Sequence, residues 1–154
     1  MSARGALALA LGLGSLLFAP DASALLCTIS TTSAVAFNNY NVFSGTPTDA
    51  VGSITFECIL FLSVDVVVVD LSTGNGGSYF PRRMSSGANT LNYNLYFDAA
   101  RMQVWGNGSG GTTHYGPLAI SSGPLVLSVY GRIPALQNAV VGSYTDTVVV
   151  TTLF

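Results

Sequence analysis

Charged side chains are scarce in this sequence, and lysine is absent. Of the 154 residues only 8% are charged, and five arginines and seven acidic residues leave a formal net charge of −2. Nucleic acids and anionic membranes are bound through clustered positive charge, which this composition does not supply, so nucleic acid is not expected as a partner. A domain with so few charges is expected to bring much of its surface against other protein.

Helical periodicity is also lacking, because no long segment carries apolar side chains at helical spacing. A period of two dominates instead, and it predicts about seven short strands separated by turn residues, which is typical of an all-β sandwich in a single domain. A short strand is predicted at the start of residues 27–37. The other predicted strands cover residues 52–62, 64–71, 91–97, 103–105, 125–133 and 144–154.

The first 24 residues have the pattern of a secretory signal peptide. Arg4 gives a short basic start, residues 6–19 are uncharged and largely apolar, and Ala22-Ser23-Ala24 supplies the small residues of a cleavage site. The apolar stretch is short for a transmembrane helix. We therefore expect a signal peptide over residues 1–24 and one mature domain over residues 25–154; a lipid anchor at Cys27 is the less favoured alternative.

Cysteine and histidine are few. Two cysteines, Cys27 and Cys58, and one histidine cannot form a closed zinc site, which needs four ligands. In an exported and oxidising setting, the two cysteines predict a single structural disulfide, and chain entropy for a loop of this size gives roughly 3–4 kcal/mol as an upper estimate.

Catalytic and cofactor motifs are weak. The glycine-rich stretch from Gly106 to Gly111 matches the spacing of a dinucleotide-binding loop, but the residues that follow do not start a helix, so a loop between strands is predicted. His114 lies in a polar loop, and no serine has the surroundings of a nucleophile elbow. We predict no catalytic residue, no metal and no cofactor.

Two further features have alternative interpretations. Arg82 and Arg83 suggest an anion site, although solvated arginines or an ion pair with a nearby acid are favoured. Trp105 borders the glycine-rich loop and is the best candidate for a surface-binding platform that stacks on sugars, although a tryptophan packed in the core or under a loop is the commoner case.

The order of motifs resembles one known family. After Cys27 and Cys58 come YFPRRM (79–84), LNYNLYFD (91–98), VWGNGSGGT (104–112), YGRIPALQN (130–138) and GSYTDTVVVTTLF (142–154). The sequence is similar in these motifs, over nearly all of the mature chain, to the spore coat protein U domain family, which includes subunits of archaic chaperone–usher (Csu-type) pili.

The resemblance implies an incomplete immunoglobulin-like β-sandwich that lacks its final strand and is completed by a strand from another subunit. It implies export through the periplasm, a periplasmic chaperone, an outer-membrane usher and other pilus subunits as partners, and no enzymatic activity. It also implies that Cys27 and Cys58 form the family's disulfide. Four residues on one face of the last strand are expected to border the open groove: Val148, Val150, Thr152 and Phe154.

One departure from the family pattern concerns the donor strand. Only Leu25 and Leu26 lie between the predicted cut and Cys27, and two residues span about 7 Å, whereas a typical strand spans ~17–20 Å. This spacing predicts a subunit that accepts a strand but gives none, at the tip or end of a surface fibre. The alternatives are a secreted carbohydrate-binding module that uses Trp105 and, less favoured, a small secreted hydrolase that uses His114.

Overall fold

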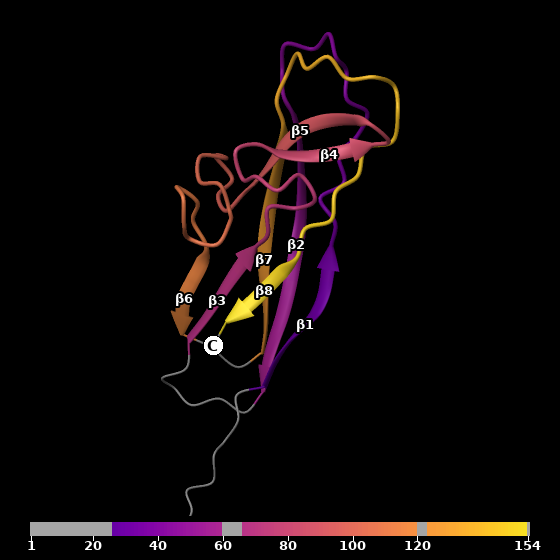
Figure 1. Cartoon of the computed structure of the whole chain (residues 1–154). Coiled ribbons are helices and arrows are strands. Elements are labelled where there is room, and N and C mark those ends of the chain that lie inside the picture. Colours follow the sequence, from indigo (N-terminus) through magenta and orange to yellow (C-terminus); the bar gives the residue numbers. More distant parts are fainter. Residues whose placement is uncertain (1–25, 60–65, 120–122, 154) are drawn as a thin grey trace, which may run out of the picture.

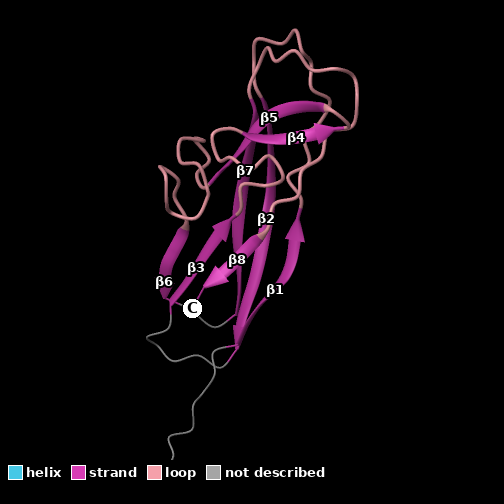
Figure 2. Cartoon of the chain, in the orientation of Figure 1, coloured by secondary structure: helices cyan, strands magenta, loops and turns pink. Residues whose placement is uncertain are grey.

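The structure is a computed structural model that describes residues 26–59, 66–119 and 123–153. All regular structure in these ranges is β, as the sequence predicts (Figure 2). The strands are β1 Leu26–Ser33, β2 Thr48–Ile59, β3 Val66–Leu71, β4 Arg82–Ser86, β5 Asn89–Tyr96, β6 Tyr115–Ala119, β7 Gly123–Ile133 and β8 Val150–Leu153. Within the described ranges, no helix has the length and apolarity needed to cross a membrane.

Two antiparallel sheets face each other (Figure 1). The larger sheet has the order β1-β2-β7-β5-β4, and the smaller has the order β6-β3-β8. Every pair of neighbouring strands in these sheets is antiparallel. The predicted all-β sandwich is therefore confirmed, and β8 pairs only with β3 among the described strands.

The core lies between the sheets because apolar residues alternate along the strands. In β3 the buried positions are Val67, Val69 and Leu71, each at most 2% exposed, and the positions between them are more exposed. Side chains two residues apart lie on one face of a strand, so this alternation directs one face inward. Ile54 and Phe56 of β2 face the same core.

A disulfide joins Cys27 and Cys58, as predicted. The two residues lie directly opposite each other in the ladder between β1 and β2. Since β1 is an edge strand of the larger sheet, the covalent bond fastens that edge to the strand beside it.

Several strand predictions need correction. Residues 103–105 form no strand of their own: Val104 and Trp105 make only isolated bridges. Two strands, β4 and β6, were not predicted, because Arg82–Ser86 and Tyr115–Ala119 lack the alternation of apolar residues that identifies the other strands. The last strand is shorter than predicted: regular pairing begins at Val150, and the predicted end, Phe154, lies outside the described residues.

Candidate functional site: an apolar groove beside the last strand

A groove of about 1510 Å³ opens into the sandwich. One rim is the segment 32–43, which follows β1, and the other is the segment 139–148 together with Val150 at the start of β8. Residues 34–40 and 146–149 lie outside the strands of the described chain. The rims therefore carry backbone N–H and C=O groups that no sheet ladder uses, and such groups form hydrogen bonds readily with an added strand.

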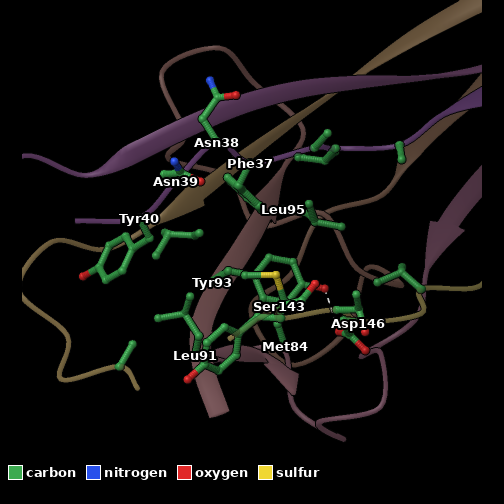
Figure 3. A pocket seen from close by; sticks show the side chains of 18 of the residues that line it. Phe37, Asn38, Asn39, Tyr40, Met84, Leu91, Tyr93, Leu95, Ser143 and Asp146 are labelled. Atoms are coloured by element: carbon green, nitrogen blue, oxygen red, sulfur yellow. Dashed lines mark hydrogen bonds between the residues drawn. The ribbon is translucent and has the colours of Figure 1, made fainter. Parts of the chain in front are cut away.

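The floor of the groove is the hydrophobic core itself. Every apolar side chain of the floor is at most 8% exposed. The floor residues come from β2, β3, β4, β5 and β7 and are Ile54, Leu71, Met84, Leu91, Tyr93, Leu95, Val129 and Ile133. Figure 3 shows four of them, Met84, Leu91, Tyr93 and Leu95, gathered in the pocket. An occupant of the groove would thus complete the core rather than rest on the surface of the domain.

The first rim approaches the larger sheet where that sheet has glycine. A Cβ on Gly131 of β7 would lie 2.4 Å from a methyl group of Val35 and 2.7 Å from the ring of Phe37. A Cβ on Gly52 of β2 would lie 2.5 Å from the carbonyl oxygen of Ser33. Only glycine leaves room for this close approach, so the two glycines allow the segment after β1 to cross over the sheet.

Asp146 fixes the second rim. Its Oδ1 accepts hydrogen bonds from the backbone N–H groups of Asn75, at 2.7 Å, and Thr147, at 2.8 Å. Its Oδ2 accepts one from Tyr93 Oη at 2.6 Å (Figure 3). Burial, followed by the hydrogen bond and the charge of Asp146, raises the pKa of Tyr93 well above its ordinary value. The phenol therefore stays protonated and donates to the carboxylate.

A second attachment lies next to this carboxylate. The backbone of Thr145 exchanges two hydrogen bonds with that of Ser85 in β4, at 2.8 and 3.0 Å. Further along, the backbone N–H of Val149 donates to Ser72 Oγ, and its carbonyl accepts from the N–H of Ser72. The segment before β8 thus runs from the edge of the larger sheet to the smaller sheet.

The predicted groove residues are placed as follows. Val148 and Val150 are half-buried and line the groove, whereas Val149 between them is 58% exposed. Thr152 is half-buried opposite Val69 in the β3–β8 ladder, beyond the lining of the groove. Phe154 lies outside the described residues.

Trp105 is not a surface platform, so that candidate is wrong, and the favoured interpretation of a tryptophan packed in the core is confirmed. Its side chain is fully buried at 0% exposed, and its indole N–H donates to the carbonyl oxygen of Val69 at 2.9 Å. Its ring packs edge-on against Phe97, with 5.6 Å between the ring centres. The physical reason is that indole has a large apolar surface and one donor, and both are satisfied between β3 and the loop after β5.

Arg82 also differs from expectation, because its side chain is fully buried rather than solvated. Its guanidinium donates to the carbonyl oxygens of Ser72 and Trp105 and to Asn94 Oδ1, at 2.7 to 3.0 Å. It also lies 4.9 Å from the centre of the Tyr79 ring. Burial lowers the pKa of Arg82, but a guanidinium remains charged in proteins. Arg83, in contrast, is exposed as predicted.

The remaining polar candidates form no recognisable reaction centre. His114 is partly buried, and its Nδ1 lies 3.3 Å from Asp70 Oδ1. The loop from Gly106 to Gly111 joins bridged segments and starts no helix, as predicted. Among the residues that the structure describes, no cluster of three or more His, Cys, Asp or Glu side chains is arranged to hold a metal ion.

Sequence reasoning missed two residues that shape the groove, Asp146 and Gly131. Each belongs to a motif that was recognised only as part of a family pattern. A signal was present for Gly131, because a glycine inside an apolar strand often marks the close approach of another segment. No signal in the sequence could pair Asp146 with Tyr93, which lies 53 positions earlier.

Together, the fold and the groove define an all-β sandwich domain with one open side. The chain belongs to the Spore Coat Protein U domain family, whose family model matches residues 15–151. This match begins inside the segment that we expect to be a signal peptide. It confirms the family that the motifs indicated.

Two similar proteins illustrate the relationship. Protein U of Myxococcus xanthus is 37% identical over 109 residues, which cover 67% of this chain and 59% of that protein. The crystal structure of a complex between the chaperone CsuC and the tip adhesion subunit CsuE, from archaic chaperone–usher Csu pili of Acinetobacter baumannii, shares the fold. The TM-score is 0.55 at 20% identity, with 85% of this chain and 40% of the matched chain covered. The chain thus spans less than two thirds of the length of either protein.

Proposed function

We propose that this chain is an exported structural subunit of a chaperone–usher surface fibre, and that its groove receives a β-strand from another subunit. The observation that carries the proposal is the groove itself, whose floor is the core of the sandwich and whose second rim leads into an edge of β8 that no strand of the described residues pairs with. An unpaired edge beside apolar side chains favours aggregation unless another strand covers it. Strand addition satisfies the backbone groups and the apolar surface together.

The partners follow from this proposal. A periplasmic chaperone would cover the groove before assembly, an outer-membrane usher would guide export, and other subunits would supply the permanent strand. Membership of the family and the fold shared with the Csu subunit support these partners. We propose the cell surface as the final location and no enzymatic activity. The carbohydrate-binding alternative loses its basis because Trp105 is buried.

A position at the tip or end of the fibre remains a prediction. It depends on cleavage of the signal peptide at the predicted site, after which too few residues would precede Cys27 to form a donor strand. Sequencing the N-terminus of the protein isolated from fibres tests it. A mature start well upstream of Leu25 would show that the chain has a donor segment and would contradict the terminal position.

The groove can be tested with two matched variants. Val148 lines the groove, whereas Val149, one residue later, is 58% exposed. We expect Val148→Asp to weaken binding of a synthetic peptide of alternating valine and threonine by at least about tenfold, because a carboxylate would be buried against apolar side chains. Val149→Asp should bind the peptide like the wild type.

The measurement is solubility and thermal stability of the exported chain with and without the peptide. The wild-type chain alone should aggregate, and the peptide at one hundred times its Kd should stabilise it by about 2.7 kcal/mol. A chain that purifies as a stable monomer and ignores the peptide would contradict the proposed function.

A further inference from the structure

Four large apolar side chains extend into solvent at one end of the molecule. Phe43 is 88% exposed, Leu136 67%, Val140 59% and Val141 102%. They belong to the loop between β1 and β2 and to the segment between β7 and β8. These two segments lie side by side at the top of Figure 1. We call the four residues the loop-end patch.

Hydrogen bonds hold the two loops together. Tyr40 Oη donates to the carbonyl oxygen of Pro134 at 2.9 Å and accepts from the backbone N–H of Gln137 at 2.7 Å. The side-chain amide of Gln137 in turn forms two hydrogen bonds with the backbone of Asn92 in β5. The apolar side chains of the patch therefore extend from a frame that is tied to the larger sheet.

The two segments that carry the patch contain no charged side chain. Neither segment 31–48 nor segment 133–145 contains an acidic or basic residue. The nearest charges along the chain are Asp49, Arg132 and Asp146, all of which hydrogen-bond within the domain. A large uncharged and apolar surface is suited to an apolar surface on another protein.

The patch is continuous with the groove. Phe43, Val140 and Val141 line the groove as well as contributing to the patch. A strand that leaves the groove at this end therefore passes directly between the patch residues.

The direction of an added strand decides at which end of the groove the folded domain of the donor subunit lies. β1 runs toward the loop end and β8 runs away from it (Figure 1). Thr48 pairs with Ile133, so both loops leave the same end of the larger sheet. An added strand that pairs with β8, the regular strand that borders the groove, in the antiparallel manner of the described sheets runs toward the loops, and it would then run parallel to β1. An N-terminal donor strand continues into its own folded domain at its C-terminal end, so that domain would lie against the loops.

We propose that the loop-end patch is the docking surface for the folded body of the subunit whose N-terminal strand fills the groove. This inference rests on the proposed function and extends it from one strand to a second, rigid contact. Burying the patch against the donor subunit would limit the movement of one subunit relative to the next and would cover apolar side chains that are otherwise in water.

Photo-crosslinking in assembled fibres tests the inference. The amino acid p-benzoylphenylalanine replaces one residue at a time in the full chain. The positions are Val148 in the groove, Val141 in the patch, and Thr28 near the start of β1, at the end of the domain away from the loops. Mass spectrometry then identifies the crosslinked peptide. We expect positions 148 and 141 to capture the same subunit, position 148 through its N-terminal segment and position 141 through its folded domain.

The outcomes separate the inference from the proposed function. If position 148 captures no N-terminal segment, the proposed function fails. If position 148 captures a donor but position 141 captures nothing or a different protein, the docking surface is overturned and the proposed function stands. Capture of the donor's folded domain at position 28 would also overturn it, because the donor strand would then run the other way.

A substitution gives a second, independent measurement. Val141→Asp should weaken binding of the captured donor subunit by about tenfold while binding of the synthetic strand peptide to the groove stays unchanged. Val126→Asp is the matched control, because Val126 is 60% exposed in β7, outside both the patch and the groove lining. Equal donor binding by the two variants would overturn the inference.

Discussion

The two sides of this sandwich differ in how completely their polar and apolar groups are satisfied. On one side lie Arg82 and Trp105, two large buried side chains. The guanidinium of Arg82 and the indole N–H of Trp105 donate hydrogen bonds to carbonyl and amide oxygens of the same chain. At the groove, the same core ends beneath an opening of about 1510 Å³, and most of the residues in the two rims lie outside the sheets.

The comparison separates intrinsic stability from assembly. The Arg82–Trp105 side needs no other chain, since its hydrogen bonds and aromatic contacts are internal. The groove side has an apolar floor and rim backbone outside the sheet ladders, for which a strand from another protein is a suitable partner. Changes on the first side should therefore affect folding, and changes on the second should affect what the domain binds.

The largest expected effect comes from removing the buried guanidinium. Arg82→Met should lower the free energy of unfolding by about 3–5 kcal/mol, because the carbonyl oxygens of Ser72 and Trp105 lose buried donors. Urea unfolding of the peptide-complemented protein measures it. Arg83→Met is the control, because Arg83 is exposed and should change stability by less than about 0.5 kcal/mol. Equal effects of the two changes would show that the closed side does not depend on Arg82.

The disulfide joins β1 to β2, and β1 leads into the first rim of the groove. Replacing Cys27 and Cys58 together by serine should cost about 3–4 kcal/mol as an upper estimate, from the entropy of a loop with a sequence separation of 31. Chemical denaturation with and without the strand peptide is the measurement. If the disulfide mainly holds the groove side in place, the peptide should bind less tightly to the double variant; unchanged peptide affinity would contradict that role.

The hydrogen bonds of Asp146 connect the second rim to the groove floor, since its partner Tyr93 is part of that floor. Asp146→Ala leaves Tyr93 Oη and the N–H of Asn75 without their acceptor and should cost about 1–3 kcal/mol. We expect peptide affinity to fall as well, because the second rim loses its anchor. Thr151→Ala, at an exposed position of β8 outside the groove lining, should change neither quantity; an equal loss there would rule out a specific role for the carboxylate.

The smallest effect concerns an ion pair away from both sides. The hydrogen bond from Arg132, with the charges of Arg101 and Arg132, lowers the pKa of Asp49, and partial burial opposes this only in part. The stability it gives is present above the unfolded pKa of about 3.9 and is lost as the pH falls through the lower folded value. Asp49→Asn should cost no more than about 1 kcal/mol at pH 7, because a third of the side chain is exposed.

An acid titration of stability checks this prediction. The difference between wild type and Asp49→Asn should vanish at low pH, where the carboxyl is protonated in both the folded and the unfolded state. A difference that persists unchanged into strong acid would show that the ion pair is not its source. Peptide binding should be unaffected, since Asp49 is not among the residues that line the groove.

Local pattern predicted the strands whose faces differ most in polarity. Residues 66–71 alternate between buried and less buried positions, residues 91–95 do so apart from the buried Asn94, and both lie in strands as expected. The pattern did not predict β4, because its buried inward residues are Arg82 and Met84, and a period-two rule assigns arginine to solvent. For the same reason Arg82 was expected in solvent or in an ion pair, whereas for Trp105 the sequence favoured a place in the core or under a loop, which the structure confirms.

The sequence by itself determined the all-β class, the single disulfide and the family, because each depends on local periodicity, on residue counts or on motifs that lie along the chain. Only the tertiary structure decided where the groove lies and what closes around it. Asp146 meets Tyr93, and Gly131 meets Val35, only in the folded domain, because each pair is distant in sequence. The physical reason is that satisfied hydrogen bonds and close backbone approaches are properties of residue pairs in space, and a single residue type does not specify its partner.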